Sequence, residues 1–219
     1  MKLPEPTGGG SFTPTPAGQH NAVCARFIDL GTQTSETAYG IKSQRKVLLG
    51  WEIPAHRIKW EKDGVEHEGP VMHFERMTFS THEKALFRQR LESWRGKPFN
   101  ENDFGNHEDA FDVRKLLGIG ALIQITHKHD NGKTYANMTA IMMPPAGKAS
   151  WAKLAGLPVY LALTKDEFDS ATFDSLSENL QNTIRQSPEY QALFDPDDSI
   201  EPKGDQTGGN DDFSDDIPF

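Results

Sequence analysis

A period of two in residues 45–53 constrains the fold of this chain more than any other stretch of its sequence. Polar residues such as Lys46 and Glu52 alternate there with large apolar ones. Side chains of a β-strand point alternately to the two faces of a sheet. The pattern therefore predicts a strand with one face in a hydrophobic core. The apolar face of this strand consists of Val47, Leu49, Trp51 and Ile53.

Other strands are predicted from apolar runs that end at turn residues. Asp63-Gly64 and Asp130-Asn131-Gly132 are sequences that favour the tight turns of hairpins. Residues 82–94 and 108–117 instead have helical spacing, and each stretch is followed by a glycine that stops a helix. The remaining predicted strands are residues 22–30, 57–61, 65–67, 71–80, 121–129, 133–143 and 159–163. Two further stretches with helical character are residues 173–185 and 188–194.

The predicted fold class is mainly β, within the α+β class. Three strands, a helical connection and a two-stranded hairpin follow one another, which is the element order of the OB-fold, a five-stranded Greek-key barrel. The helical insert between strands 3 and 4, about residues 82–118, is longer than the simplest such barrels carry. We expect four parts: a flexible N-terminal arm (1–18), the OB-fold domain (19–145), a partly helical C-terminal extension (146–194) and a disordered acidic tail (195–219).

Charge is distributed unevenly along the 219 residues. The net charge is −9, yet residues 195–219 alone hold nine acidic residues and one basic residue, whereas residues 1–164 carry 20 basic and 17 acidic residues. A mildly basic body with an acidic tail is typical of a nucleic-acid binder that carries its own competitor for the binding groove. An ordinary acidic protein with a more acidic tail has the same charge pattern, and charge alone does not separate the two.

The candidate binding residues come mainly from a basic and aromatic stretch, residues 42–62. Single-strand binding without sequence preference needs cations for phosphates and aromatic faces for bases. Trp51 shares the apolar face described above, so core burial is favoured for it, whereas Trp60 lies among charges beside a turn and favours exposure. The predicted DNA-binding residues are Lys42, Arg45, Lys46, Trp51, Arg57, Lys59, Trp60, Lys62, Phe74, Arg76 and Tyr135.

Catalytic and metal sites are weakly supported by the sequence. His127 and His129 share a strand face and could bind a metal, but no further ligand lies at a telling spacing, and solvated histidines are favoured. The only cysteine, Cys24, lies in an apolar strand, which favours a buried small side chain over a nucleophile. A nuclease-like group of carboxylates is an alternative to helix capping for Asp103, Glu108, Asp109 and Asp112. We therefore expect no catalytic residue, metal or other cofactor.

An acidic tip with a small apolar plug closes the sequence. Repulsion among its aspartates keeps the segment solvated, while Pro218 limits its conformations and Phe219 provides an aromatic anchor with a carboxylate. The residues predicted to dock partner proteins are Asp212, Asp215, Asp216, Ile217, Pro218 and Phe219. This tip resembles the C-terminus of bacterial-type single-stranded DNA-binding proteins, in which acidic residues precede Ile-Pro-Phe.

The body of the chain is similar to phage-encoded single-stranded DNA-binding proteins. Residues 25–33, 46–54, 91–99 and 111–118 carry this similarity. The helical insert is longer, and the linker shorter, than in cellular bacterial relatives, which puts their usual homotetramer in doubt and leaves homo-oligomerisation open.

The resemblance implies a protein that coats and protects single-stranded DNA in replication, recombination and repair, and recruits DNA-processing proteins through its tip. The absence of a signal peptide, of a long apolar run and of paired cysteines leads us to expect a cytoplasmic protein, in the bacterial host if phage-encoded. The rival hypotheses are an interaction adaptor, whose tail mimics a host tip without DNA binding, and a metal-dependent nuclease.

Overall fold

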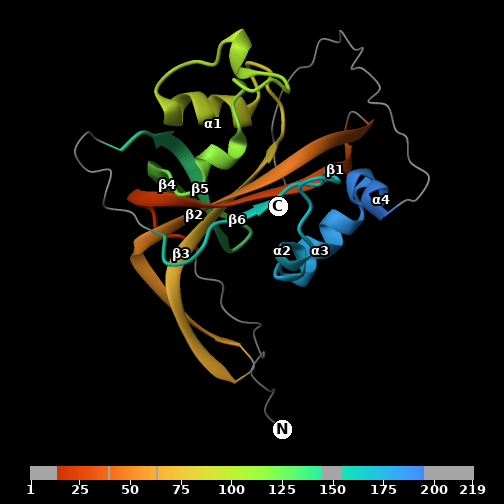
Figure 1. Cartoon of the computed structure of the whole chain (residues 1–219). Helices are drawn as coiled ribbons and strands as arrows, with labels where there is room; N and C mark the ends of the chain where they lie inside the picture. The colour runs from red at the N-terminus through yellow and green to blue at the C-terminus, as the bar shows by residue number, and fades with distance from the viewer. Residues whose placement is uncertain (1–13, 39, 63, 145–153, 195–219) are drawn as a thin grey trace. The chain divides into compact units, whose positions relative to one another are not determined.

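The chain is mainly β with few helices, as the sequence predicts (Figure 1). The computed structural model describes residues 14–38, 40–62, 64–144 and 154–194, without the side chains of residues 37 and 62. The strands are β1 (Gly18–Thr37), β2 (Gly40–Lys62), β3 (Val65–Thr78), β4 (Gly120–Asp130), β5 (Lys133–Met142) and β6 (Val159–Leu161). The helices are α1 (Leu86–Arg95), α2 (Ser170–Asp174), α3 (Glu178–Arg185) and α4 (Pro188–Phe194), with 3₁₀ helices η1 (Glu101–Asp103) and η2 (Val113–Leu116).

The strands of the described residues form one sheet with the order β3-β2-β1-β4-β5, and β6 pairs with β1. β1 and β4 are antiparallel, with Gly18 opposite Ile125 and Val23 opposite Gly120. β4 and β5 form the predicted hairpin, whose turn residues Asn131 and Gly132 both have positive φ. The order therefore places the two hairpins, β2–β3 and β4–β5, on either side of β1.

Two compact units are each assembled from three segments of the chain. The first unit consists of Met1–Ala25, Gly50–Glu75 and Ser93–Pro158, and the second of Arg26–Leu49, Arg76–Glu92 and Val159–Phe219. The long strands β1, β2 and β3 contribute to both units. The segment after Val159, predicted as a separate extension, thus belongs to one unit with parts of the first two strands.

The core of the first unit is built around two tryptophans. Trp51 is fully buried, and its ring centroid lies 6.2 Å from that of Trp94 on α1. Nε1 of Trp94 donates a hydrogen bond to the carbonyl oxygen of Gly120 (2.8 Å), which holds α1 against the start of β4. Ile123 and Ile125 alternate into the same unit from β4 and are fully buried. The apolar face predicted for residues 45–53 is therefore a core face.

The second unit has its own hydrophobic cluster, in which the C-terminal helices cover parts of β1 and β6. Helices this short are marginal alone and depend on such packing. The buried members are Ile28, Leu30, Leu161, Leu163, Phe173, Leu176 and Ile184. Partly buried residues that pack against them are Leu48, Val159, Phe168, Leu180, Tyr190 and Leu193.

Two helix predictions were wrong in extent. Residues 108–117 form turns and the single 3₁₀ turn η2 instead of a helix, because the Asp112 carboxylate caps that turn through the Arg114 N–H (2.8 Å). Residues 173–185 form two helices rather than one, since α2 ends at Asp174 and Ser177 begins α3 as its N-cap. The Ser175 hydroxyl donates to the carbonyl oxygen of Thr172 (2.6 Å), and the Gln181 amide donates to that of Leu176 (3.0 Å). Side-chain bonds of this kind compete with helix continuation.

Part of the predicted N-terminal arm belongs to the folded body. Thr15 is buried, and its carbonyl oxygen lies 2.8 Å from Nε2 of His127 on β4. Its hydroxyl lies 3.4 Å from Nδ1 of the buried His73 on β3. Thr15 of the expected arm is therefore packed within the first unit. The rest of the expected arm, residues 1–13, lies outside the described residues.

We predict that Gly31→Ala strongly destabilises the second unit. Gly31 has φ +66°, and a Cβ there would lie 2.3 Å from Oγ of Ser187. Left-handed backbone costs a residue with Cβ about 1–2 kcal/mol, and overpacking adds about 1–3 kcal/mol. Gly118→Ala is the control, because Gly118 has φ +79° but open space around it. Urea unfolding that shows equal losses for both variants contradicts the tight approach of Ser187.

Candidate nucleic-acid interface

An exposed aromatic stack marks the distal part of the β2–β3 hairpin in the first unit. The indole of Trp60 stacks on the ring of His67 across the hairpin, with centroids 5.7 Å apart and planes at 18°. Gly69 faces the edge of the indole, since a Cβ there would lie 3.0 Å from the ring. Trp60 still leaves 45% of its surface exposed. The hairpin thus presents a supported aromatic surface, the arrangement on which a nucleic-acid base can stack.

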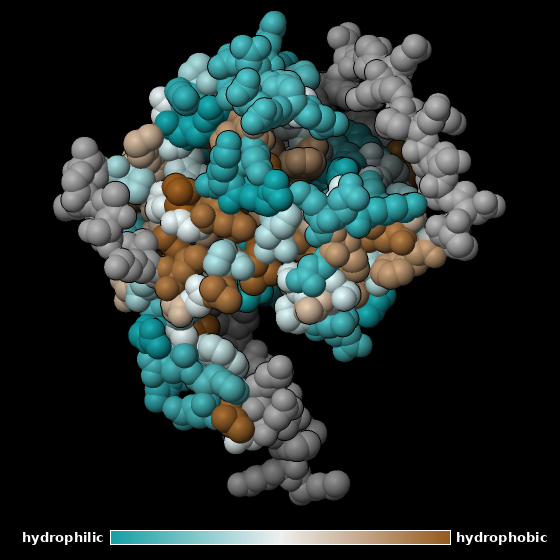
Figure 2. Space-filling model, in the orientation of Figure 1, coloured by the Kyte–Doolittle hydropathy of each residue, from teal (hydrophilic) through white to brown (hydrophobic). Residues whose placement is uncertain are grey.

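The cations of this hairpin are paired with acidic residues of the opposite strand. Arg57 bonds through Nε to Glu68 (2.5 Å), and Nζ of Lys59 bonds to Glu66 (2.8 Å). All four side chains are about half exposed or more, and pairs of this kind contribute about 0–1 kcal/mol. A phosphate can therefore exchange for either carboxylate. Figure 2 shows that the surface of the distal part of the β2–β3 hairpin is mostly hydrophilic.

Trp51 is a correction to the predicted DNA-binding set. Its side chain has no exposed surface, so it cannot stack on a base. The core alternative favoured by its apolar face is confirmed. Lys62 cannot be placed, because its side chain lies outside the described residues.

The other first-unit candidates lie on β3 and β5. Phe74 is exposed on β3, and Tyr135 is half-buried on β5. Tyr135 is directly opposite Lys128 of β4 in the antiparallel register. Cross-strand neighbours of this kind are close enough for their side chains to interact, so β4–β5 presents an aromatic and a cationic side chain together.

The predicted cations of the second unit fall into two groups. Lys42 and Arg76 are exposed. Lys46 is half-buried, and its Nζ donates to Oε1 of Gln44 (2.9 Å) and to Oγ1 of Thr78 (2.8 Å). Arg45 forms an ion pair with the buried Asp29. Two of these four predicted cations, Arg45 and Lys46, are thus bonded to neighbouring side chains. A sequence pattern cannot show such pairing.

Arg45 holds its charge in spite of partial burial. Burial acts to lower the pKa of its guanidinium, but the hydrogen bond and charge of Asp29 outweigh it, so the pKa lies above its ordinary value. The Arg45 guanidinium also lies 5.9 Å from the centroid of the Phe79 ring. Cation–π attraction operates at this range. Arg45 is therefore a fixed positive charge beside an aromatic ring.

Phe79 is a candidate that the sequence analysis missed. It follows the end of β3 and is 38% exposed. Its ring makes edge contacts with Phe27 (6.2 Å) and with Phe87 (5.2 Å), both of which are buried. Buried aromatic neighbours and Arg45 hold Phe79 in one position. The available signal was an aromatic residue three positions after Arg76, directly before the Ser-Thr pair that precedes α1.

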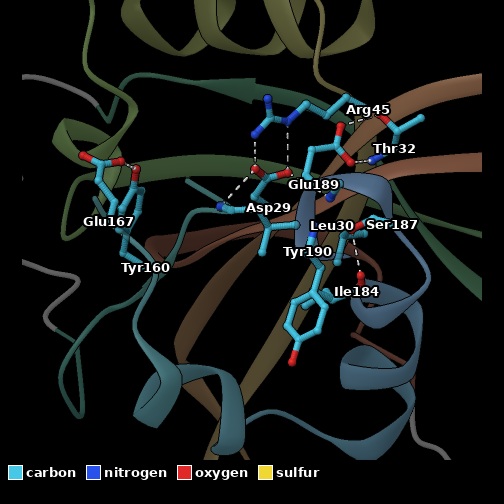
Figure 3. A network of polar contacts seen from close by, with 12 residues as sticks. Asp29, Leu30, Thr32, Arg45, Tyr160, Glu167, Ile184, Ser187, Glu189 and Tyr190 are labelled. Atoms are coloured by element: carbon cyan, nitrogen blue, oxygen red, sulfur yellow. Dashed lines mark hydrogen bonds and ion pairs between the residues drawn. The ribbon is translucent and has the colours of Figure 1, made fainter. Parts of the chain in front are cut away.

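A carboxylate from α4 is hydrogen-bonded to β1 in the same unit. Glu189 accepts from the backbone N–H of Thr32 (2.7 Å) and from its hydroxyl (2.6 Å). Figure 3 shows the Glu189 side chain reaching Thr32 beside Arg45. Burial acts to raise the pKa of Glu189, but the two bonds from Thr32, helped by the charge of Arg45, bring it below its ordinary value. The Glu189 carboxylate is thus held in its ionised form.

Two of the carboxylates considered for a nuclease, Asp103 and Asp112, instead stabilise local turns. Asp103 accepts from the backbone N–H of Asn100 (2.9 Å) and from Nη2 of Arg95 (3.1 Å). Asp112 accepts from the N–H and the guanidinium of Arg114. Within residues 14–144 and 154–194, apart from positions 39 and 63, no group of three or more His, Cys, Asp or Glu residues is arranged to hold a metal ion.

None of the helices in this part of the chain is long and apolar enough to cross a membrane.

The predicted partner-docking tip, residues 212–219, lies outside the described residues. No protein-family model matches this chain, and no curated protein matches it either.

We predict that the Glu189–Thr32 contact stabilises the fold at neutral pH and is lost in acid. Because the pKa of Glu189 is lowered in the folded state, its contribution is present above the unfolded pKa of about 4.3 and disappears as pH falls through the folded pKa. The free energy of unfolding of wild type minus that of Glu189→Gln should therefore shrink between neutral and acidic pH. Glu178→Gln, at an exposed glutamate of α3, is the control for the loss of one negative charge. A difference that grows in acid contradicts this prediction.

Proposed function

We propose that this protein binds single-stranded DNA without sequence preference and coats it during replication, recombination and repair. The observation that carries the proposal is the Trp60–His67 stack, an aromatic surface that is both supported and exposed. Single-strand binders use such surfaces because every base has a π-face. The proposed role is binding rather than catalysis, and no cofactor is required for it.

The strand order supports an OB-fold for this chain. In that fold a helix connects the third strand to the fourth. The order β3-β2-β1-β4-β5, with α1 between β3 and β4, is consistent with this arrangement. We therefore take the sheet as an elaborated OB-fold in which β2 and β3 are extended into a long hairpin. Nucleic-acid binding is a common use of that fold.

Each unit has its own exposed cations in this proposal. Arg57 and Lys59 flank Trp60, and their exposed ion pairs can exchange a carboxylate for a phosphate. Lys42 and Arg76 are exposed on the second unit. Side chains of these types hold the backbone of a strand while aromatic residues hold its bases.

The acidic tip would recruit other DNA-processing proteins. The resemblance of residues 211–219 to the tip of bacterial single-stranded DNA-binding proteins supports this part of the proposal. A cytoplasmic location, in the bacterial host if the protein is phage-encoded, is part of the same proposal.

One observation favours the adaptor as a second candidate. The pairs Arg57–Glu68 and Lys59–Glu66 balance the charge near Trp60, and a charge-balanced aromatic surface also suits a protein partner. DNA binding and its dependence on salt separate the two candidates, because a protein-binding hairpin gives no affinity for an oligonucleotide.

We predict that Trp60→Ala weakens binding of a dT oligonucleotide by about 1–3 kcal/mol, the value of one base–aromatic stack. Fluorescence anisotropy measures the affinity, and thermal unfolding should show little change. Val65→Ala is the matched control, since Val65 is exposed on the same hairpin, and Trp60→Phe should recover part of the loss. In wild type, about four neutralised phosphates give a slope of log K against log salt near −3. Equal affinity for duplex, or no salt dependence, contradicts the proposed function.

We further predict that deleting residues 211–219 tightens DNA binding at low salt. A tethered acidic segment competes for the same cations at high effective concentration, and salt screens that competition. Replacing Asp211, Asp212, Asp215 and Asp216 with Asn should reproduce the gain, whereas Phe219→Ala should leave the affinity unchanged. If Phe219→Ala shifts the affinity as much as the deletion does, the tail acts by packing on the body, and the separate docking role fails.

A further inference from the structure

Thr32 and Arg45 form the lining of a small anion site in the second unit. The Thr32 backbone N–H and hydroxyl both point to one position, where they donate bonds of 2.7 and 2.6 Å to the Glu189 carboxylate. Arg45 and Glu189 are close enough to shift each other's pKa values. Two donors beside a fixed positive charge are the groups with which proteins bind anionic oxygens. We call this arrangement the Thr32 anion site.

The occupant of this site belongs to a short element, α4, whose Tyr190 ring contacts those of Phe168 (5.8 Å) and Phe173 (5.0 Å). α4 has seven residues, and none of them is buried. Its Tyr190 and Leu193 are only partly buried against the hydrophobic cluster. Short segments with few buried contacts open locally at a lower free-energy cost than the core does. The proposal below requires that Glu189 leave the Thr32 anion site while the rest of the unit stays folded.

The neighbouring helix α3 is attached to β1 independently of α4. Nε2 of Gln33 donates to the carbonyl oxygens of Leu30 (2.7 Å) and of Thr183 at the end of α3 (3.1 Å). Ile184 is fully buried in the cluster. The buried hydroxyl of Ser187 accepts from the N–H of Tyr190 (3.2 Å), so α4 begins anew after α3. The two helices are therefore separate elements joined through the buried Ser187.

Arg45 also lies beside a partly exposed aromatic side chain, Phe79. The guanidinium of Arg45 lies 5.9 Å from the ring centroid of Phe79, which is 38% exposed. A strand of nucleic acid presents a phosphodiester and a stackable base within one nucleotide. Arg45 thus interacts both with the aromatic ring and with the carboxylate of Glu189.

We propose that the Thr32 anion site binds a phosphodiester of single-stranded DNA, and that Glu189 occupies it in the absence of DNA. This inference rests on the proposed function and adds a second DNA contact, with its own regulation, to the Trp60 hairpin. The site is available only in the fraction of molecules in which α4 has moved, so the apparent affinity is reduced by that fraction. Removing the Glu189 charge should increase the fraction of molecules in which the site is available.

The test compares Glu189→Gln with Glu178→Gln, which removes the same charge from an exposed position of α3. With a dT oligonucleotide at low salt, we expect Glu189→Gln to raise the affinity by roughly three- to tenfold, the value of one lost competing charged hydrogen bond. The slope of log K against log salt should steepen by about 0.7, for one added phosphate contact. Glu178→Gln should gain less than about twofold with an unchanged slope. Adding Thr32→Val to Glu189→Gln should remove part of the gain.

A measurement on the wild-type chain covers the case in which a variant is destabilised. Hydrogen exchange of α4 amides should become faster when the dT oligonucleotide is added, while α3 amides stay protected. Unchanged or slower exchange in α4 overturns the proposal, as does a Glu189→Gln variant that behaves like Glu178→Gln. Inorganic phosphate is the second probe, and faster α4 exchange with phosphate alone would assign the site to a free anion rather than to a strand. These outcomes do not affect the Trp60→Ala test of the proposed function. If the wild-type chain does not bind the oligonucleotide, both proposals are wrong.

Discussion

The buried carboxylate of Asp29 is the interaction on which the second unit depends. It accepts from the N–H of Gly31 (2.9 Å), pairs with Arg45 of β2 and lies 3.4 Å from the N–H of Leu163, just after β6. Burying a charge is costly unless it is paired and hydrogen-bonded. Asp29 meets both conditions only when β1, β2 and the segment after β6 are in place together. This requirement couples residues more than 130 positions apart in the sequence.

The same interaction creates the local backbone shape that receives α4. With its N–H bonded to Asp29, Gly31 adopts a positive φ, and the absence of a Cβ admits Ser187 and Glu189 at close range. Thr32 then presents its N–H and hydroxyl outward to the helix. The buried Asp29 carboxylate thus fixes the backbone from which Thr32 presents its two donors. The Thr32 anion site is therefore formed by the sheet itself and not by a separate loop.

Much of the fold could be predicted from local patterns. The hairpin turns at Gly64 and at Asn131–Gly132, the buried face through Trp51 and the helix α1 all depend on neighbours in sequence. Trp60 was assigned to an exposed position for the same reason, since charged residues surround it. The failures occurred where side chains bond nearby backbone groups, at Asp112, which caps η2, and between α2 and α3, where Ser175 and Gln181 donate to backbone carbonyls. Capping and continuation differ by little free energy there, and tertiary contacts decide the outcome.

The sequence by itself determined the strands, their turns, the core face of β2 and the charge contrast between body and tail, because periodicity, turn chemistry and charge are properties of short segments. Only the tertiary structure decided which charges are paired. Arg45 reads as one more cation in a basic stretch, yet it is bound to Asp29, sixteen positions away. In the sequence, Glu189 has the pattern of an ordinary acidic residue in the first turn of a helix. In the structure it accepts a hydrogen bond from Thr32, which is 157 positions away in the sequence. Pairings of this kind depend on chain segments that meet only after folding, so no local pattern records them.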